Sequence, residues 1–453
     1  MCIVGIAGIA AAGLGGGRIS AGRDQKRAYQ LEHGSDHKPF FTALFEAAIA
    51  AADPALSIRK YLPEKPKGRT VVVGAGKGVA QMAAALEASW DAPLEGVVVT
   101  RYGYSAPTEK ITVLEAAHPV PDEAGLAAAR RLLETVEGLT EDDLVIALVC
   151  GGGSALLPAP AGKLTLADEI AVNEALLASG APISAMNVVR KHISSIKGGR
   201  LAAAAHPARV VSLIVSDIPG DDPALVSSGP TVPNSANSDD ALAAIAAYGI
   251  KLPDAVMQHL RSEDAAAPGP KDARFAGHEV HVIASAAQSL EAAAQAAEQQ
   301  GVAAVILSDA MEGEAREVGR LHAAIAREIV LKDRPFRKPV VVLSGGETTV
   351  TIRDKGGRGG RNSEFLLALA VEIEGMDGIC AFAADTDGID GSENNAGAFA
   401  DSTSVTRLRA AGIDAKACLA GHDAWSAFDA LGDLFVPGPT GTNVNDLRAI
   451  VVR

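Results

Sequence analysis

Five glycine-rich loops that follow short apolar runs are the segments of this chain best suited to chemistry. They read GAGKG (74–78), CGGGSALLP (150–158), SGGET (344–348), GGRGGRNSE (356–364) and DTDGIDGSENNAG (385–397). In a parallel sheet, ligands bind at the carboxyl ends of the strands, where glycine lets backbone N–H groups approach a phosphate or carboxylate closely. A single loop of this kind is often a tight turn, whereas five predict a site for a polyanion. The residues expected to hold that anion are Gly76, Gly152, Gly153 and Ser154.

Lys77 is the most informative single residue, because it stands between two glycines at the end of the run RTVVVGAGKG. A lysine at the mouth of a strand lies over the place that an anion would occupy. There it would neutralise charge that develops on a phosphoryl group during transfer. A solvated loop lysine is the alternative reading.

The same loop resembles part of the fingerprint for dinucleotide binding, GxGxxG, but it departs from it. Val79 stands where the third glycine belongs, and Thr100 and Arg101 stand where an acid would hold the ribose. Arg101 could instead serve a phosphorylated ribose, so an NADP-dependent reductase stays open. The phosphate-binding pattern GxxxxGK[ST] is absent.

A cluster of cations occurs in the segment NVVRKHISSIKGGRLA (187–202). The formal net charge is −14, so an anionic small substrate needs such a local cluster. Helical spacing puts positions 190, 194 and 197 on one face. The residues that we expect to bind substrate or phosphate here are Asn187, Arg190, Lys191 and Lys197. A solvated helix face that ends in a glycine cap is the alternative.

Carboxylates follow two of the apolar runs. Asp217 ends the run RVVSLIVSD, where a metal-binding or proton-accepting group is commonly placed. Asp385 and Asp387 follow a later run, in a loop that superficially resembles a calcium-binding EF-hand. Asp390 stands where that loop requires glycine, so Mg²⁺ together with a phosphate is the better expectation. The metal ligands expected are Asp217, Asp385 and Asp387.

Apolar runs alternate with helical stretches, such as one that Asp122 can cap and one that Thr165 can cap. Continuous apolar strands in that alternation predict α/β domains with a parallel sheet covered by helices on both faces. At 453 residues the chain is too long for one core. The expected division is a disordered or non-native leader at 1–38, a Rossmann-like domain at 39–261, a linker at 262–277 and a mixed α/β domain at 278–453. The active-site cleft is expected between the two domains.

Composition excludes several partners. The acidic charge and an aromatic share of 4% argue against nucleic acid, which needs a basic face and stacking side chains. The apolar start of the chain is short and lacks basic residues, so neither a signal peptide nor a membrane span is expected. Four cysteines without CxxC spacing indicate a reduced, cytoplasmic protein. The oligomeric state, a homodimer included, is left open.

Taken together, the motifs resemble those of the glycerate 2-kinases of bacteria and archaea, also called class II glycerate kinases, which carry a C-terminal MOFRL-type domain. The resemblance runs from about residue 40 to the end of the chain. The segments that carry it are GAGKG, AAHPVPDEAG, CGGGSALLPAP, NVVRKHISSIKGGRLA, SDIPGDDPALVSSGPT, SGGETTVTI, GRGGRNSE and AADTDGIDGSENNAGA.

The resemblance implies phosphorylation of D-glycerate at its 2-hydroxyl, with ATP and Mg²⁺, to give 2-phosphoglycerate. It also implies that Lys77 and Arg361 are essential and that Asp217 takes part. The second domain is then expected to contribute Glu347, Asn362 and Glu364 to the cleft. Some relatives have been labelled hydroxypyruvate reductases, which keeps the NADP-dependent activity as the alternative.

Overall fold

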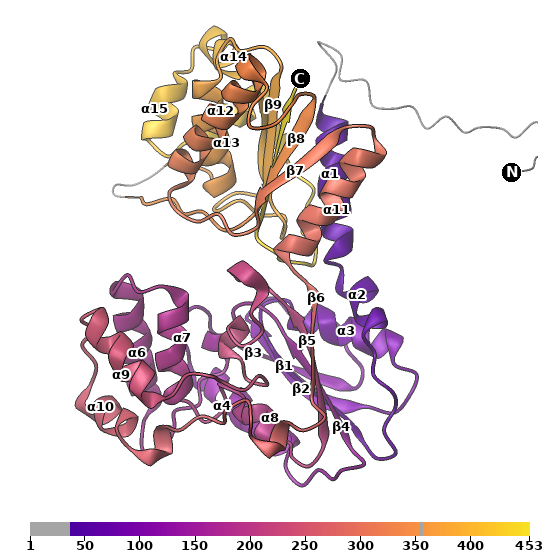
Figure 1. Cartoon of the computed structure of the whole chain (residues 1–453), viewed down its shortest axis with the longest axis vertical. Helices are drawn as coiled ribbons and strands as arrows, with labels where there is room; N and C mark the ends of the chain where they lie inside the picture. Colours follow the sequence, from indigo (N-terminus) through magenta and orange to yellow (C-terminus); the bar gives the residue numbers. More distant parts are fainter. Residues whose placement is uncertain (1–36, 353–356) are drawn as a thin grey trace, which may run out of the picture.

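The computed structural model describes residues 37–352 and 357–453. These residues form two α/β domains, each built around a six-stranded sheet (Figure 1). The expected fold class is confirmed: the first sheet is parallel throughout and the second is mixed.

The first sheet has the strand order β3-β2-β1-β4-β5-β6. Its strands are β1 (Thr70–Ala75), β2 (Glu95–Arg101), β3 (Ile111–Ala116), β4 (Leu144–Val149), β5 (Arg209–Val215) and β6 (Glu279–Ala284). The order reverses between β1 and β4, so the connections from these two strands leave toward opposite faces. Ligands of such sheets bind at this reversal, outside the carboxyl ends of the strands.

Helices cover both faces of the first sheet, because side chains from successive positions of each strand enter different cores. Val72 packs with residues of α2 and α3, whereas Val71 and Val73 pack with residues of α4, α5 and α8. The bounds of these helices are α2 (Pro54–Lys60), α3 (Val79–Ser89), α4 (Glu123–Thr135), α5 (Gly153–Leu156) and α8 (Arg200–Ala204).

A helical subdomain extends from the first sheet and has a small core of its own. It contains α6 (Leu166–Ala178), α7 (Ile183–His192), α9 (Ser238–Ala247) and α10 (Asp254–Leu260). The Thr165 hydroxyl accepts from the Asp168 N–H at the start of α6, and the Asp122 carboxylate accepts from the Gly125 N–H at the start of α4. Both expected caps are thereby confirmed.

The second sheet has the strand order β11-β10-β9-β12-β8-β7. Its strands are β7 (Ala303–Ser308), β8 (Val340–Ser344), β9 (Ile379–Asp385), β10 (Gly397–Asp401), β11 (Leu434–Phe435) and β12 (Asp446–Val452). The central strand β12 runs antiparallel to both of its neighbours, β8 and β9.

One face of the second sheet is covered by five helices and the other by two. The five are α12 (Ala315–Lys332), α13 (Arg361–Glu372), α14 (Ser404–Ala410), α15 (Ala415–Ala420) and α16 (Ala424–Leu431). The two are α1 (Lys38–Ala51) and α11 (Ala286–Gln299), which lie side by side in Figure 1.

The predicted domain boundaries, 39–261 and 278–453, do not coincide with the extents of the two sheets and the helices that cover them. The strand expected to open the second domain, β6, pairs with β5 of the first sheet. The helix expected to open the first domain, α1, packs Phe41 and Phe45 against Phe382 of the second sheet. Periodicity identifies a strand or an amphipathic helix but carries no information about which sheet it joins.

The predicted linker, 262–277, therefore lies within the first domain, between α10 and β6. The predicted leader, 1–38, lies outside the described residues except for its last two, and α1 begins at Lys38. In the portion of the chain that is described, no single helix is long and apolar enough to cross a membrane. Only the bent pair of α1 and α2 meets that length and composition together.

Candidate active site

Three loops of the first domain meet at the carboxyl ends of β1, β4 and β5. They carry Lys77, the glycines Gly151 and Gly152, and Asp217. The contact is close: a Cβ atom on Gly151 would lie 1.8 Å from Oδ2 of Asp217, and one on Gly152 would lie 3.0 Å from Cγ of Lys77. Any larger residue at position 151 would displace Asp217. The glycines thus let a cation and a carboxylate approach the same point.

The carboxyl group of Asp217 has a raised pKa. Burial raises its pKa to about 6, Lys77 acts in the opposite direction, and Glu347 raises it further. Glu347 belongs to the second domain, in the loop after β8. Asp217 therefore faces a cation of its own domain and a carboxylate of the other.

The glycine loop after β4 presents backbone N–H groups at the same place. Those of Gly152, Gly153 and Ser154 have no acceptor among the residues that the structure describes. Gly152 has a φ of 83°, in the left-handed region that favours glycine. These N–H groups are free to bind an anion.

Beside this point lies a cavity of about 210 Å³ between the strand ends and the helical subdomain. Its polar lining is His118, Ser154, Asn187, Arg190, Asp217 and Ser228, among other residues. Arg190 Nε donates to Asn173 Oδ1 at 2.9 Å, which fixes its guanidinium from one side. Asn187 accepts from Ser228 Oγ at 3.0 Å. Arg190 and Asn187, two of the expected binding residues, thus share one cavity with Asp217.

His118 is a site residue that the sequence reasoning missed. Burial, with Lys77 and Arg101 adding to it, lowers its pKa to about 4, so its imidazole is neutral near pH 7. Its position directly after β3, in the segment AAHPVP, is the signal that could have identified it.

Two other expected binding residues, Lys191 and Lys197, do not line this cavity. Lys197 is buried, donating to Leu157 O at 2.9 Å and forming an ion pair with Glu169 at 2.5 Å. Lys191 is also buried, with Nζ 3.4 Å from Asn234 Oδ1. The predicted helical spacing of these residues is wrong, because α7 ends at His192 and Lys197 lies in a turn beyond it. The Lys197 ammonium group instead holds Glu169 of α6.

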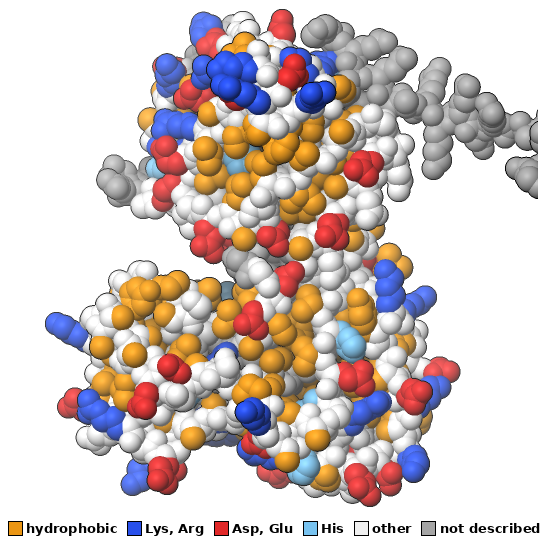
Figure 2. Space-filling model, in the orientation of Figure 1, with side chains coloured by type: hydrophobic (Ala, Val, Ile, Leu, Met, Phe, Trp, Pro, Cys, Tyr) orange, Lys and Arg blue, Asp and Glu red, His pale blue; other side chains and the backbone are white. Residues whose placement is uncertain are grey.

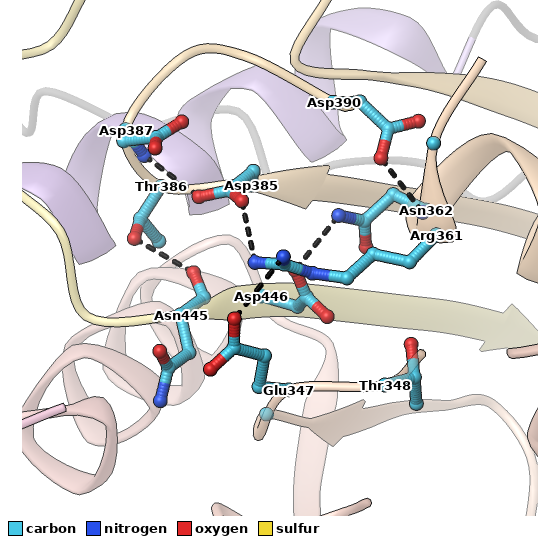
Figure 3. A network of polar contacts seen from close by, with 12 residues as sticks. Glu347, Thr348, Arg361, Asn362, Asp385, Thr386, Asp387, Asp390, Asn445 and Asp446 are labelled. Carbon is cyan, nitrogen blue, oxygen red and sulfur yellow. Dashed lines mark hydrogen bonds and ion pairs between the residues drawn. The ribbon is translucent and has the colours of Figure 1, made fainter. Parts of the chain in front are cut away.

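The second domain presents Arg361 at the start of α13 (Figure 3). Its Nε donates to Asp446 Oδ1 at 2.8 Å and its Nη2 to Asp385 Oδ2 at 2.6 Å. Its Nη1 lies 3.2 Å from Glu347 Oε1. Burial disfavours the charged guanidinium, but the three carboxylates outweigh that effect and raise the pKa of Arg361.

The other residues predicted in this domain, Asn362, Glu364 and Asp387, form hydrogen bonds or ion pairs within the protein. Asn362 is buried and donates from Nδ2 to Asp446 Oδ1 at 2.8 Å. Glu364 is also buried, and its two oxygens are held by Arg316 at 2.6 Å and by His422 at 2.9 Å. Asp387 lies near Asp385, whose Oδ1 accepts from the Asp387 N–H at 3.0 Å.

The two domains meet along residues 441–445, the loop that leads into β12. Asn445 Nδ2 donates to the backbone oxygen of Asp217 at 2.8 Å, and Thr442 Oγ1 donates to Ala52 O at 3.0 Å. Gly441, Thr442 and Asn443 share a narrow cavity of about 30 Å³ with Lys77 and Asp217. Figure 2 shows the surface hollowed between the two domains. The candidate site is thus built from both.

Known proteins are similar to this chain in sequence and in fold. Residues 340–446 match the MOFRL family, and residues 40–261 match a domain of unknown function (DUF4147). The D-glycerate 2-kinase of Thermotoga maritima is 39% identical over 406 residues, covering 89% of this chain and 95% of that protein. A crystal structure of glycerate kinase from the same organism superposes with a TM-score of 0.83, at 37% identity, over 92% of this chain and 99% of that one. The chain belongs to the glycerate kinase family with a MOFRL domain.

A second relative within this glycerate kinase family carries another name. A protein of Agrobacterium vitis, provisionally named hydroxypyruvate reductase, is 54% identical over 411 residues, covering 90% of this chain and 93% of that protein. The two names imply different ligands at the loop after β1, a phosphoryl group or a dinucleotide.

The N–H groups of that loop are already bonded within the protein. Lys77 N–H donates to Gly151 O at 2.8 Å, and Gly78 N–H lies 3.2 Å from the Cys150 sulfur. A dinucleotide-binding fold needs such N–H groups at the helix start for the pyrophosphate. Among the described residues, the N–H groups of Gly152, Gly153 and Ser154 in the loop after β4 have no acceptor, whereas those of Lys77 and Gly78 are bonded.

Proposed function

We propose that this member of the glycerate kinase family transfers the γ-phosphoryl group of ATP to the 2-hydroxyl of D-glycerate, giving 2-phosphoglycerate and ADP. One observation carries most of this proposal. Lys77 and Asp217 meet at the mouth of a small polar cavity that also holds Arg190. A cation for the phosphoryl group, a carboxylate for the hydroxyl and an arginine for the substrate's own carboxylate are the parts that this reaction needs.

The cavity would hold glycerate with its carboxylate toward Arg190. Arginine binds carboxylates through two parallel N–H donors, and the bond from Nε to Asn173 leaves its terminal nitrogens for a ligand. Asn187, Ser154 and the neutral His118 offer hydrogen bonds to the hydroxyl groups.

Asp217 would accept the proton of the 2-hydroxyl. A carboxylate whose pKa is about 6 is still ionised near pH 7 to 8, yet it is a stronger base than an ordinary aspartate. Lys77 and the N–H groups of Gly152, Gly153 and Ser154 would stabilise the negative charge of the transferring group from one side. Arg361 would stabilise the same negative charge from the second domain.

Magnesium would enter as the MgATP complex. Among the described residues no cluster of three or more metal-binding side chains exists, and one oxygen of Asp385 is already held by Arg361. Mg²⁺ keeps several waters and binds through phosphates with one or two carboxylates, so these residues fit an ion carried by the nucleotide. Asp385 and Asp387 are the carboxylates that we propose for it. The free thiols Cys150, Cys380 and Cys418 suit a reducing cytoplasm.

The test is ADP release from D-glycerate and MgATP, with the organic product passed to enolase in the absence of a mutase. Prompt conversion by enolase identifies 2-phosphoglycerate. ADP release without that conversion would mean phosphorylation at another hydroxyl. Oxidation of NADPH by hydroxypyruvate with no ADP release would establish the reductase activity named for the Agrobacterium vitis relative and would refute the kinase proposal.

A further inference from the structure

Asn445 combines a left-handed backbone conformation with a side-chain hydrogen bond to the first domain. Its φ is 66°, in the left-handed region, and its side chain is buried. Glycine satisfies such a backbone at no steric cost, and asparagine tolerates it. The side chain therefore has to be explained by the bond that it makes, which is the one from Nδ2 to Asp217 O at 2.8 Å.

The main chain of Asn445 bonds to the opposite side of the cleft. Its carbonyl oxygen accepts from the N–H of Thr386 at 3.0 Å and from the Thr386 hydroxyl at 2.7 Å. Thr386 directly follows Asp385, and Asp446 directly follows Asn445. Both of those carboxylates hold Arg361 (Figure 3).

One residue thus joins the two halves of the candidate site. Its side chain binds the backbone oxygen of Asp217, just after β5. Its backbone bonds to Thr386 and lies next to Asp446, in the segments whose carboxylates Asp385 and Asp446 bind Arg361. A second bond between the domains, from Thr442 to Ala52, is independent of it. Loss of the Asn445 side chain should therefore misalign the two halves without separating the domains.

We propose that Asn445 is a positioning residue that aligns Asp217 with Arg361 for phosphoryl transfer. The inference rests on the proposed function and adds a requirement to it: the reaction needs a bond that touches neither substrate. Small displacements of reacting groups lower turnover strongly, because transfer depends on in-line geometry.

The test compares Asn445→Gly and Asn445→Asp with the unchanged enzyme. Glycine keeps the backbone conformation and removes the side chain, whereas aspartate keeps the shape but cannot donate to Asp217 O. Asp333→Gly is the matched control, because Asp333 also has a positive φ, 50°, but ends α12. Melting temperature, kcat, the KM values for glycerate and MgATP, and the pH profile are measured for each protein.

We expect both variants at position 445 to lose about tenfold in kcat, the order that one hydrogen bond supplies, with KM changed by less than about twofold. The acid limb of the kcat profile should move to higher pH in both, since Asp217 shifts away from Lys77. The control should keep its kcat and profile. Unchanged kcat and pH profile in both variants, or an equal loss in the control, would overturn the positioning role while leaving the kinase proposal intact. An unchanged enzyme without glycerate kinase activity would overturn both.

Discussion

Asp385 on β9 and Asp446 on β12 are register partners across two antiparallel strands, and the guanidinium of Arg361 bonds to both. Side chains of facing residues lie about 5 Å apart. Two carboxylates at that spacing repel each other, and burial adds to the cost. Burial and the charge of Asp446 raise the pKa of Asp385, while Arg361 opposes them. Arg361 is therefore required by the fold as well as by the chemistry proposed for it.

Removal of Arg361 is expected to destabilise the second domain. In Arg361→Ala the buried Asp385 and Asp446 lose their shared partner, and breaking a buried pair typically costs about 3–5 kcal/mol. Arg358→Ala is the matched control from the same loop. Its ion pair with Glu393 lies at the surface, and surface ion pairs contribute little to stability. Denaturant unfolding of both variants measures the difference, and equal losses would contradict this account.

Lys77→Ala is expected to lose activity without losing stability. Removing one group that stabilises transition-state charge typically costs about 10²–10³ in turnover. Among the described residues, the Lys77 side chain forms no hydrogen bond or ion pair, and its charge acts on the nearby Asp217. Lys67→Ala, at an exposed lysine, serves as the control. A folded Lys77→Ala enzyme with near-normal kcat would remove Lys77 from the reaction.

The pKa of Asp217 predicts an acid limb in the activity profile. Since this pKa is about 6, kcat/KM for glycerate should fall by half near pH 6 and about tenfold for each further unit of acidification. A profile that stays flat from pH 7.5 to pH 5 would exclude Asp217 as the base.

The same shift predicts a dependence of stability on pH. Burial raises this carboxyl's pKa in the folded protein above the ordinary value of 3.8, so the folded state binds the proton more tightly than the unfolded state. Its contribution to stability is therefore full at low pH and is lost as pH rises toward 6, a change of up to about 3 kcal/mol. Asp217→Asn removes this dependence, so its stability relative to the unchanged enzyme should be greater at pH 7 than at pH 4. Equal differences at the two pH values would contradict the shift.

Arg190 and Lys197 should behave oppositely when replaced. Arg190→Ala is expected to raise KM for glycerate at least tenfold with little effect on stability, because an arginine–carboxylate bond is lost. Lys197→Ala leaves Glu169 buried without its partner and should cost about 3–5 kcal/mol of stability, with kcat of the folded fraction unchanged. The double variant Lys197→Met, Glu169→Gln should recover much of that stability. A raised KM in Lys197→Ala would return Lys197 to the substrate site.

Local features of the fold were predictable because they depend on neighbours in the sequence. Asp122 and Thr165 cap helices where their positions indicated, and the glycine loops lie at strand ends. Features that depend on distant partners were not. The spacing predicted Arg190 and Lys197 on one helix face, but α7 ends at His192, and Lys197 is buried in an ion pair with the distant Glu169.

The candidate site was partly predictable for the same reason. Lys77 and Asp217 follow strands, and a parallel sheet brings the ends of its strands together. The contribution of Asn445 was not visible, because its importance lies in a bond between residues 228 positions apart. His118 could have been noticed from its place after a strand, but nothing in its neighbourhood indicated that Lys77 would lie beside it.

The exchange of elements between the domains separates the order of synthesis from the order of folding. The helix α1 is synthesised before every other described element, yet its aromatic face packs against Phe382 and other residues of the second sheet, whose central strand β12 comes far later in the sequence. This packing surface of α1 cannot form until β12 has been synthesised. The strand β6 meanwhile completes the first sheet only after the helical subdomain has been made. The second domain therefore cannot finish folding as a contiguous segment, whereas the elements of the first domain, from α2 to β6, follow one another without interruption.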